Sequence, residues 1–143
     1  MRKIKYITSE DPRSAEFNTY ITSNYEAFLT ETSPDLILVT GGDGAMLHAI
    51  QQHHHHKVPF VGHAAGTLNF LMNSIDNIEA ALKKILDDES ELHVLETTSI
   101  QVDLFDKDGL ARNLGYAVNE VVFGSDIMGY HSYIITSEDG SFD

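Results

Sequence analysis

One short segment combines residue types that could bind and transfer a phosphate group. Gly41-Gly42-Asp43-Gly44 follows an apolar run at residues 36–39 and precedes the apolar positions of a helix. Glycines in such a turn permit positive φ and let backbone N–H groups approach a phosphate without a Cβ atom in the way. A carboxylate facing a phosphate would repel it, so Asp43 suits this place only as a metal ligand or as a base for a hydroxyl group. The alternative is a structural turn with Asp43 as the helix N-cap.

Histidines form the second group with chemical potential. Four of them are consecutive at residues 53–56, and imidazoles at this spacing can chelate nickel, copper or zinc. A solvated helix end or a remnant of engineering is the commoner origin of such a run, so we assign no metal site to it. His63 lies in a second glycine-containing segment and could contact a ligand, although loop histidines bonded to backbone are more common.

The elements that must position these residues alternate between strand and helix. Short apolar runs at residues 36–39 and 58–61 are typical of parallel strands that are buried on both faces, and residues 4–8 form a weaker strand candidate. Apolar residues at helical spacing predict helices that end near residue 29 and span residues 78–86. The alternation predicts an α/β fold with a Rossmann-like, mostly parallel sheet and right-handed connections. The apolar stripe of the first helix consists of Phe17, Ile21, Tyr25 and Phe28.

The pattern changes to β in the second half of the chain. Residues 93–105 favour a strand, and Asp106-Lys107-Asp108-Gly109 is typical of a hairpin turn leading to a second strand. A third strand at residues 130–136 would complete a small meander. We therefore predict an α/β nucleotide-binding domain at residues 1–90 and the first strands of an incomplete all-β domain at residues 91–143.

Composition narrows the possible partners. The 143 residues include 9 Lys and Arg against 22 Asp and Glu, which gives a net charge of −13 at pH 7. Such a charge repels nucleic acids and anionic membranes, so we expect neither as a partner. The absence of cysteine excludes disulfides, thiolate nucleophiles and Cys-ligated zinc. The basic amino end lacks the apolar stretch of a signal peptide and no run is long enough to span a membrane, so we expect a cytoplasmic protein.

Three motifs in the same order resemble those of the NAD kinase family. Gly41-Gly42-Asp43-Gly44 resembles its GGDG motif, residues 62–71 resemble its second glycine loop, and Val118-Asn119-Glu120-Val121-Val122 resembles its NE motif. The resemblance extends over essentially the whole chain. It implies transfer of the γ-phosphate of ATP, or of phosphate from polyphosphate, to the 2′-hydroxyl of the adenosine ribose of NAD. NADP would be the product, and Mg²⁺ would neutralise the triphosphate.

The resemblance also implies a role for each site residue. Asp43 would contact the acceptor ribose and act as general base. Phe70 would pack on the substrate adenine, Asn119 would hydrogen-bond the adenine, and Glu120 would bind the other ribose. The backbone that borders the phosphates would be that of Gly41, Gly42 and Gly44.

The chain departs from the family pattern at several positions. Ala45 stands where the family usually has Thr or Ser, and Asn69 replaces a Gly. A later segment of the GSTAY type, which closes over NAD in the family, does not occur in these residues, so we expect an incomplete β domain whose open strand edges promote homo-oligomer formation. Two alternatives remain open. Gly66-Thr67-Leu68-Asn69-Phe70 is similar to the GTxND loop of diacylglycerol kinases, and the chain could be a lipid kinase of the diacylglycerol or sphingosine type; a catalytically incomplete nucleotide-binding fragment would share the same motifs.

Overall fold

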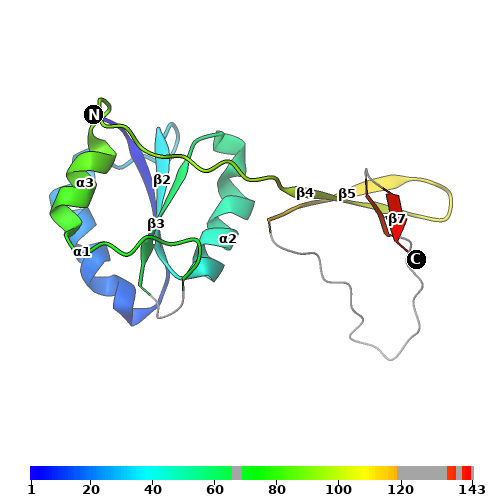
Figure 1. Cartoon of the computed structure of the whole chain (residues 1–143), viewed down its shortest axis with the longest axis horizontal. Helices are drawn as coiled ribbons and strands as arrows, with labels where there is room; N and C mark the ends of the chain where they lie inside the picture. Colours follow the sequence, from blue (N-terminus) through cyan, green and yellow to red (C-terminus); the bar gives the residue numbers. More distant parts are fainter. Residues whose placement is uncertain (66–68, 119–134, 138–139, 143) are drawn as a thin grey trace.

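A parallel three-stranded sheet forms the centre of the amino-terminal part of the chain (Figure 1). Its strands lie in the order β1 (Ile4–Thr8), β2 (Leu36–Gly41) and β3 (Phe60–Ala64). Helices pack on the sheet, and antiparallel strands follow later in the chain, which confirms the predicted fold class. The structure is a computed structural model, and it describes residues 1–65, 69–118, 135–137 and 140–142.

β2 is the central strand and is buried along its whole length. Its side chains alternate between two hydrophobic cores, so that Leu38 packs in one core with Phe17 and Val39 packs in the other with Met46. The predicted burial of residues 36–39 on both faces is therefore confirmed. β3 lies at the edge of the sheet, begins at Phe60 rather than at residue 58, and is less buried than predicted because it pairs with β2 alone among the described strands.

Helices cover the two faces of this sheet (Figure 1). α1 (Ala15–Asn24) and α3 (Ile78–Leu86) contribute to one core, and α2 (Asp43–His53) contributes to the other. The first helix ends earlier than the predicted residue 29. The side-chain amide of Asn24 donates a hydrogen bond of 2.8 Å to the carbonyl of Tyr20, which competes with the helical backbone pattern, and a 3-10 turn, η2 (Glu26–Phe28), follows.

The connection from β1 to β2 first runs along the side of β1 that faces away from β2. After α1 the chain forms a parallel bridge between Leu29 and Ile4, and the Thr30 N–H donates to the carbonyl of Ile4 at 2.9 Å. The chain then crosses to the other side of β1 and enters β2, from which α2 leads outward to β3. If two right-handed connections leave their strands in opposite directions along the sheet, their helices lie on opposite faces. The connections that follow β1 and β2 meet this condition, because α1 and α2 lie on opposite faces. The change of direction therefore falls at β1 and β2.

An antiparallel hairpin follows an extended segment (Figure 1). It consists of β4 (Ile100–Phe105) and β5 (Ala111–Ala117), and its turn is held by Asp106, whose Oδ1 accepts from the N–H groups of Asp108 and Leu110 at 2.9 Å. The predicted turn is confirmed, but the strand expected from residue 93 begins only at Ile100. The hairpin exposes large apolar side chains, namely Ile100, Leu104, Phe105, Leu110, Leu114 and Tyr116.

The last described strands are β6 (Ile135–Ser137) and β7 (Gly140–Phe142), which pair with each other. Within the described residues they form a sheet separate from β4 and β5. Most of the third strand predicted at residues 130–136 lies outside the described residues, so the meander stays a prediction. The boundary between domains near residue 90 stays a prediction. None of the described helices has the length and apolar character needed to span a membrane.

Candidate functional site

The carboxyl ends of β1 and β2 meet where the connections of the sheet change direction. Ligands of doubly wound α/β proteins bind at such a switch point, beyond the carboxyl ends of the strands. The N–H of Ser9 donates to the carbonyl of Thr40 at 2.9 Å, and the Ser9 hydroxyl is 2.9 Å from that of Ser14. Sequence patterns did not indicate Ser9 as a site residue. Its position directly after β1 was the signal that could have placed it at this edge of the sheet.

Gly41 ends β2 in a conformation that side chains rarely adopt. Its φ is +154°, and a Cβ atom there would lie 2.8 Å from the Cβ of Ala45 and 3.1 Å from that of Ser9. Ala45, where the family usually has Thr or Ser, therefore packs directly against this glycine. Only glycine at position 41 lets β2, β1 and the start of α2 approach so closely.

Gly42 and Gly44 have different surroundings from Gly41. Gly42 is the N-cap of α2, and its carbonyl accepts from the N–H of Ala45 at 3.0 Å. A Cβ atom at Gly42 would lie 3.7 Å from its nearest neighbour, and one at Gly44 would meet nothing within 4 Å. The described protein atoms thus leave open space beside Gly44 and only an ordinary contact beside Gly42, so neither glycine is crowded as Gly41 is.

Asp43 is the first residue of α2 and Gly42 is the N-cap, so the N-cap position weighed for Asp43 is wrong. Its carboxylate reaches across to the segment after β3. Oδ2 accepts from the N–H of Phe70 at 2.9 Å, while Oδ1 accepts from Phe70 at 3.1 Å and from Leu71 at 2.9 Å. Asp43 therefore joins the two segments that the motifs had marked separately. The role of the Leu71 backbone had no signal in the sequence.

The segment that Asp43 holds is also anchored to the sheet. The N–H of Asn73 donates to the carbonyl of Gly62 at 3.0 Å, and the carbonyl of Asn73 accepts from Ala64 at 2.9 Å. The Phe70 side chain, in contrast, is 90% exposed. An aromatic ring on a backbone that is anchored at Phe70, Leu71 and Asn73 is thus presented to solvent next to Asp43.

Several predicted site residues lie outside the described part of the chain. These are Asn119 and Glu120, together with Gly66, Thr67 and Leu68 of the second glycine loop. Their roles stay predictions. The structure therefore brings together Asp43, Phe70 and the glycines of the first motif, at the carboxyl edge of the sheet.

His63 belongs to β3 and not to a loop, which corrects its assignment to the second glycine loop. Its ring stacks on Phe17 with centroids 3.9 Å apart, and burial lowers its pKa. The backbone hydrogen bond expected of a loop histidine is not what holds it, because Nδ1 has no partner among the described residues. His63 is part of the packing between β3 and α1.

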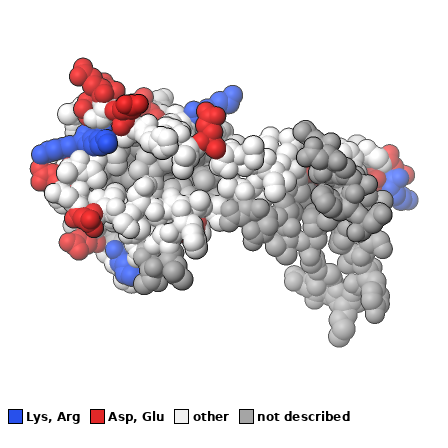
Figure 2. Space-filling view, in the orientation of Figure 1, with Lys and Arg blue, Asp and Glu red and all other residues white. Residues whose placement is uncertain are grey.

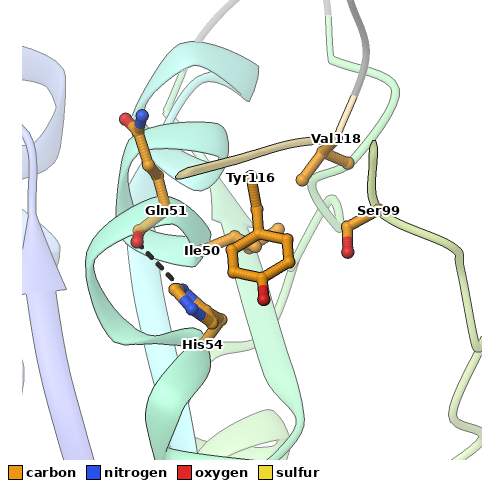
Figure 3. Close-up of a pocket in the computed structure, with 6 residues that line it drawn as sticks. All are labelled: Ile50, Gln51, His54, Ser99, Tyr116 and Val118. Carbon is orange, nitrogen blue, oxygen red and sulfur yellow. Dashed lines mark hydrogen bonds between the residues drawn. The ribbon is translucent and has the colours of Figure 1, made fainter. Parts of the chain in front are cut away.

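A small pocket lies near the other end of α2 (Figure 3). It is lined by Ile50, Gln51, His54, Ser99, Tyr116 and Val118, and its volume is about 90 Å³. Ligand pockets for molecules of nucleotide size measure roughly 300–1,000 Å³. None of the predicted site residues lines this pocket, so the candidate site is instead the open edge around Asp43 and Phe70.

The charge distribution offers no basic surface for phosphate on the face shown in Figure 2. Asp and Glu gather over α1 and α3 there, while the Lys and Arg side chains drawn on this face are scattered. Positive potential at the candidate site comes from the amino-terminal end of α2, where the peptide dipoles of the helix point their N–H groups outward. A parallel sheet covered on both faces, with a glycine turn before this helix at the switch point, defines a doubly wound α/β domain.

Comparison with known proteins places this domain in one family. The family model described as the ATP-NAD kinase N-terminal domain matches residues 2–90. An NAD kinase of Rickettsia bellii is 32% identical over 121 residues, which are 85% of this chain and 45% of that protein. An NAD kinase of Rickettsia africae is 38% identical over 89 residues, which are 61% of this chain and 32% of that protein. An NAD kinase of Corynebacterium diphtheriae is 32% identical over 90 residues, which are 62% of this chain and 28% of that protein. The chain belongs to the NAD kinase family, and it spans less than half the length of these relatives.

The different surroundings of the motif glycines predict opposite effects of alanine. Gly41→Ala forces a Cβ atom against Ala45 in an unfavourable backbone conformation, so we expect it to lower the free energy of unfolding by about 2 kcal/mol or more. Gly44→Ala is the matched control. It lies in the first turn of α2 with free space around it, so stability should stay the same or rise by up to about 1 kcal/mol. Urea unfolding of both variants measures the difference, and equal destabilisation would contradict it.

Proposed function

We propose that this chain provides the amino-terminal part of an NAD kinase that works in the cytoplasm. The enzyme would transfer the γ-phosphate of ATP, or phosphate from polyphosphate, to the 2′-hydroxyl of the adenosine ribose of NAD. Membership of the family supports the proposal, and the single observation that favours it is the Asp43 carboxylate at the switch point, bonded to the backbone that bears Phe70.

The proposed step is a displacement at phosphorus. The ribose oxygen forms a bond to the γ-phosphorus while the bond from that phosphorus to the β,γ-bridging oxygen breaks, and ADP leaves with the electron pair. The hydroxyl proton passes to the Asp43 carboxylate. An ionised carboxylate has about four acceptor positions, and the contacts to Phe70 and Leu71 use two on Oδ1 and one on Oδ2. Among the contacts of the described residues, one position on Oδ2 therefore remains for a ribose hydroxyl.

The other site residues would bind substrate without taking part in the bond changes. The exposed ring of Phe70 offers a flat apolar surface on which adenine could stack. By resemblance to the family, Asn119 would hydrogen-bond the adenine and Glu120 would bind the other ribose. The backbone of the glycine motif and the start of α2 would face the phosphates.

ATP would bind as its Mg²⁺ complex, so the cation enters as part of the substrate. Among the described residues, no group of three or more metal-ligating side chains includes Asp43. Oxygen atoms of the triphosphate and water would therefore supply most ligands of the ion, as is usual for Mg²⁺ bound with nucleotides. Neutralising the triphosphate matters here because the chain itself has a net charge of −13.

The acceptor decides between the proposed function and its alternatives. We expect the complete product of this gene to transfer label from [γ-³²P]ATP or polyphosphate to NAD, with Mg²⁺ required, and not to diacylglycerol or sphingosine. Label in lipid would identify a lipid kinase, because the two acceptors are separated by extraction into organic solvent. Nucleotide binding without transfer to any acceptor would identify a non-catalytic nucleotide-binding protein.

Two substitutions at Asp43 separate its proposed role as base from its role in holding the Phe70 segment. Asp43→Asn keeps an oxygen that can accept from both backbone N–H groups but removes the proton acceptor. We expect kcat to fall by about 10²–10⁴-fold, while the Kd for NAD changes by less than about threefold. Asp43→Ala also releases the segment, so the Kd should rise by about tenfold or more in addition.

Stopped-time assays of NADP formation and calorimetric titration with NAD measure these two effects. The Asn variant is the matched control for the Ala variant, since both lose the base and only one loses the anchor. If both weaken NAD binding equally, Asp43 is a substrate clamp and not the base.

We further propose that a second copy of this chain covers the exposed hairpin. Phe105 is 65% exposed and Leu110 is 73% exposed, which is unusual for large apolar residues that are close together in a hairpin. Strand edges of β4 and β5 are also unpaired in the described residues, and such edges readily add another strand.

Sedimentation velocity tests this assembly. We expect a dimer or larger oligomer at micromolar concentration, and we expect Phe105→Ser to shift the distribution toward monomer. Leu95→Ser is the control, because Leu95 is 82% exposed but lies outside the hairpin. A monomeric wild-type chain, or an equal shift by both variants, would contradict the proposal.

A further inference from the structure

Three of the four consecutive histidines converge at the end of α2. His53 is the last residue of this helix, and His55 and His56 lie in the 3-10 turn η3 (His54–His56) that follows. One ligand nitrogen from each ring lies within 4.8 Å of the others, and the rings of His55 and His56 have centroids 4.3 Å apart. Nitrogens bound to one Zn²⁺ at about 2.1 Å in tetrahedral geometry are roughly 3.4 Å apart. Binding of one ion would therefore draw the three rings closer together than they are in this structure.

His53 supplies a second, independent observation. Its Nδ1 atom is buried and has no hydrogen-bond partner within the part of the chain that the structure describes. Buried polar atoms in proteins are nearly always paired, and the unpaired Nδ1 of His53, unlike that of His63, belongs to a ring whose neighbours also offer ligand nitrogens. An ion at this nitrogen would provide the missing partner without displacing an existing hydrogen bond.

Burial and nearby charges act in the same direction on two of the three imidazoles. Burial lowers the pKa of His53 and of His56, and the nearby Lys5 and the other histidines lower both further. Lys5 is paired with Glu31, whose carboxylate acts on His53 in the opposite direction and offsets part of the positive charge that would oppose a cation.

His54 does not join the cluster although it stands in the middle of the run. Its Nδ1 is 3.0 Å from the carbonyl oxygen of Gln51, and its ring meets the edge of Tyr116 at a centroid distance of 5.2 Å (Figure 3). Four histidines on a flexible chain would be equivalent as ligands. In this fold they are not, because one is held in a separate pocket.

We propose that His53, His55 and His56 bind a first-row transition-metal ion. Three imidazole nitrogens with an open fourth position match Zn²⁺ best, with Cu²⁺ and Ni²⁺ as stronger or comparable competitors for nitrogen ligands. The site is at the carboxyl end of α2, where the helix dipole favours a cation, and Asp43 is at the opposite end of the same helix. The bound ion would hold the end of α2 against η3 and would not take part in phosphate transfer.

Zn²⁺ titration of the 143-residue chain, prepared without an affinity tag, tests the site. We expect one equivalent to bind in competition with a chromophoric chelator and to raise the melting temperature by a few degrees. His53→Gln and His56→Gln should each weaken binding by at least about tenfold, since loss of even an outer-shell partner costs this much. His54→Gln is the matched control and should change the Kd by less than about twofold.

If Gln at each of the positions 53, 54, 55 and 56 weakened Zn²⁺ binding equally, the histidines would act as a flexible chelating run, and the proposal would be overturned. The proposal would also be overturned if the wild-type chain bound Zn²⁺ no more tightly than His53→Gln does, or if saturation with Zn²⁺ did not raise the melting temperature. Because His53 is partly buried, melting of each variant in EDTA reports whether the fold persists. His55→Gln repeats the test at an exposed ring and should also weaken binding by at least about tenfold.

Discussion

Burial of β2 on both faces is the constraint on which the rest of the structure depends. All six residues of this strand are buried, so apolar surface must come from helices on both sides of the sheet. α1 and α3 supply the apolar side chains that cover one face, and α2 supplies those that cover the other. Connections on opposite faces leave the sheet in opposite directions, and this places a switch point at the carboxyl ends of β1 and β2. The candidate site is therefore a consequence of how the core is covered.

The Asp43 carboxylate links the local geometry of this edge to its proposed chemistry. Hydrogen bonds to Phe70 and Leu71 hold the start of α2 against the segment after β3, and the same side chain is the proposed base. A carboxylate suits both tasks because its two oxygens accept several hydrogen bonds at once. The opposite end of α2 bears the histidine cluster, so one helix connects two sites of different chemistry without bringing them into contact.

Boundaries of elements were harder to predict than their existence. The apolar stripe through Phe28 suggested one long helix, but the Asn24 side chain competes for a backbone carbonyl and α1 ends there. β-favouring residues from position 93 suggested a long strand, yet pairing begins only at Ile100, where β5 offers a partner. His63 was assigned to a loop because of its glycine neighbours, whereas register with Thr40 places it in β3. In each case a contact outside the local pattern decided the boundary.

The sequence by itself determined the buried parallel strand at residues 36–39, the glycine turn and helix after it, the Asp106 hairpin turn and membership of the NAD kinase family. These features depend on side chains that are close together in the chain, so hydrophobic spacing and turn residues are enough to specify them. Only the tertiary structure decided that Asp43 bonds residues 27 and 28 positions away, and that His54 separates from its three neighbours. Those contacts depend on how β3, β5 and α2 pack in space, and no periodicity along the chain specifies which distant residues meet.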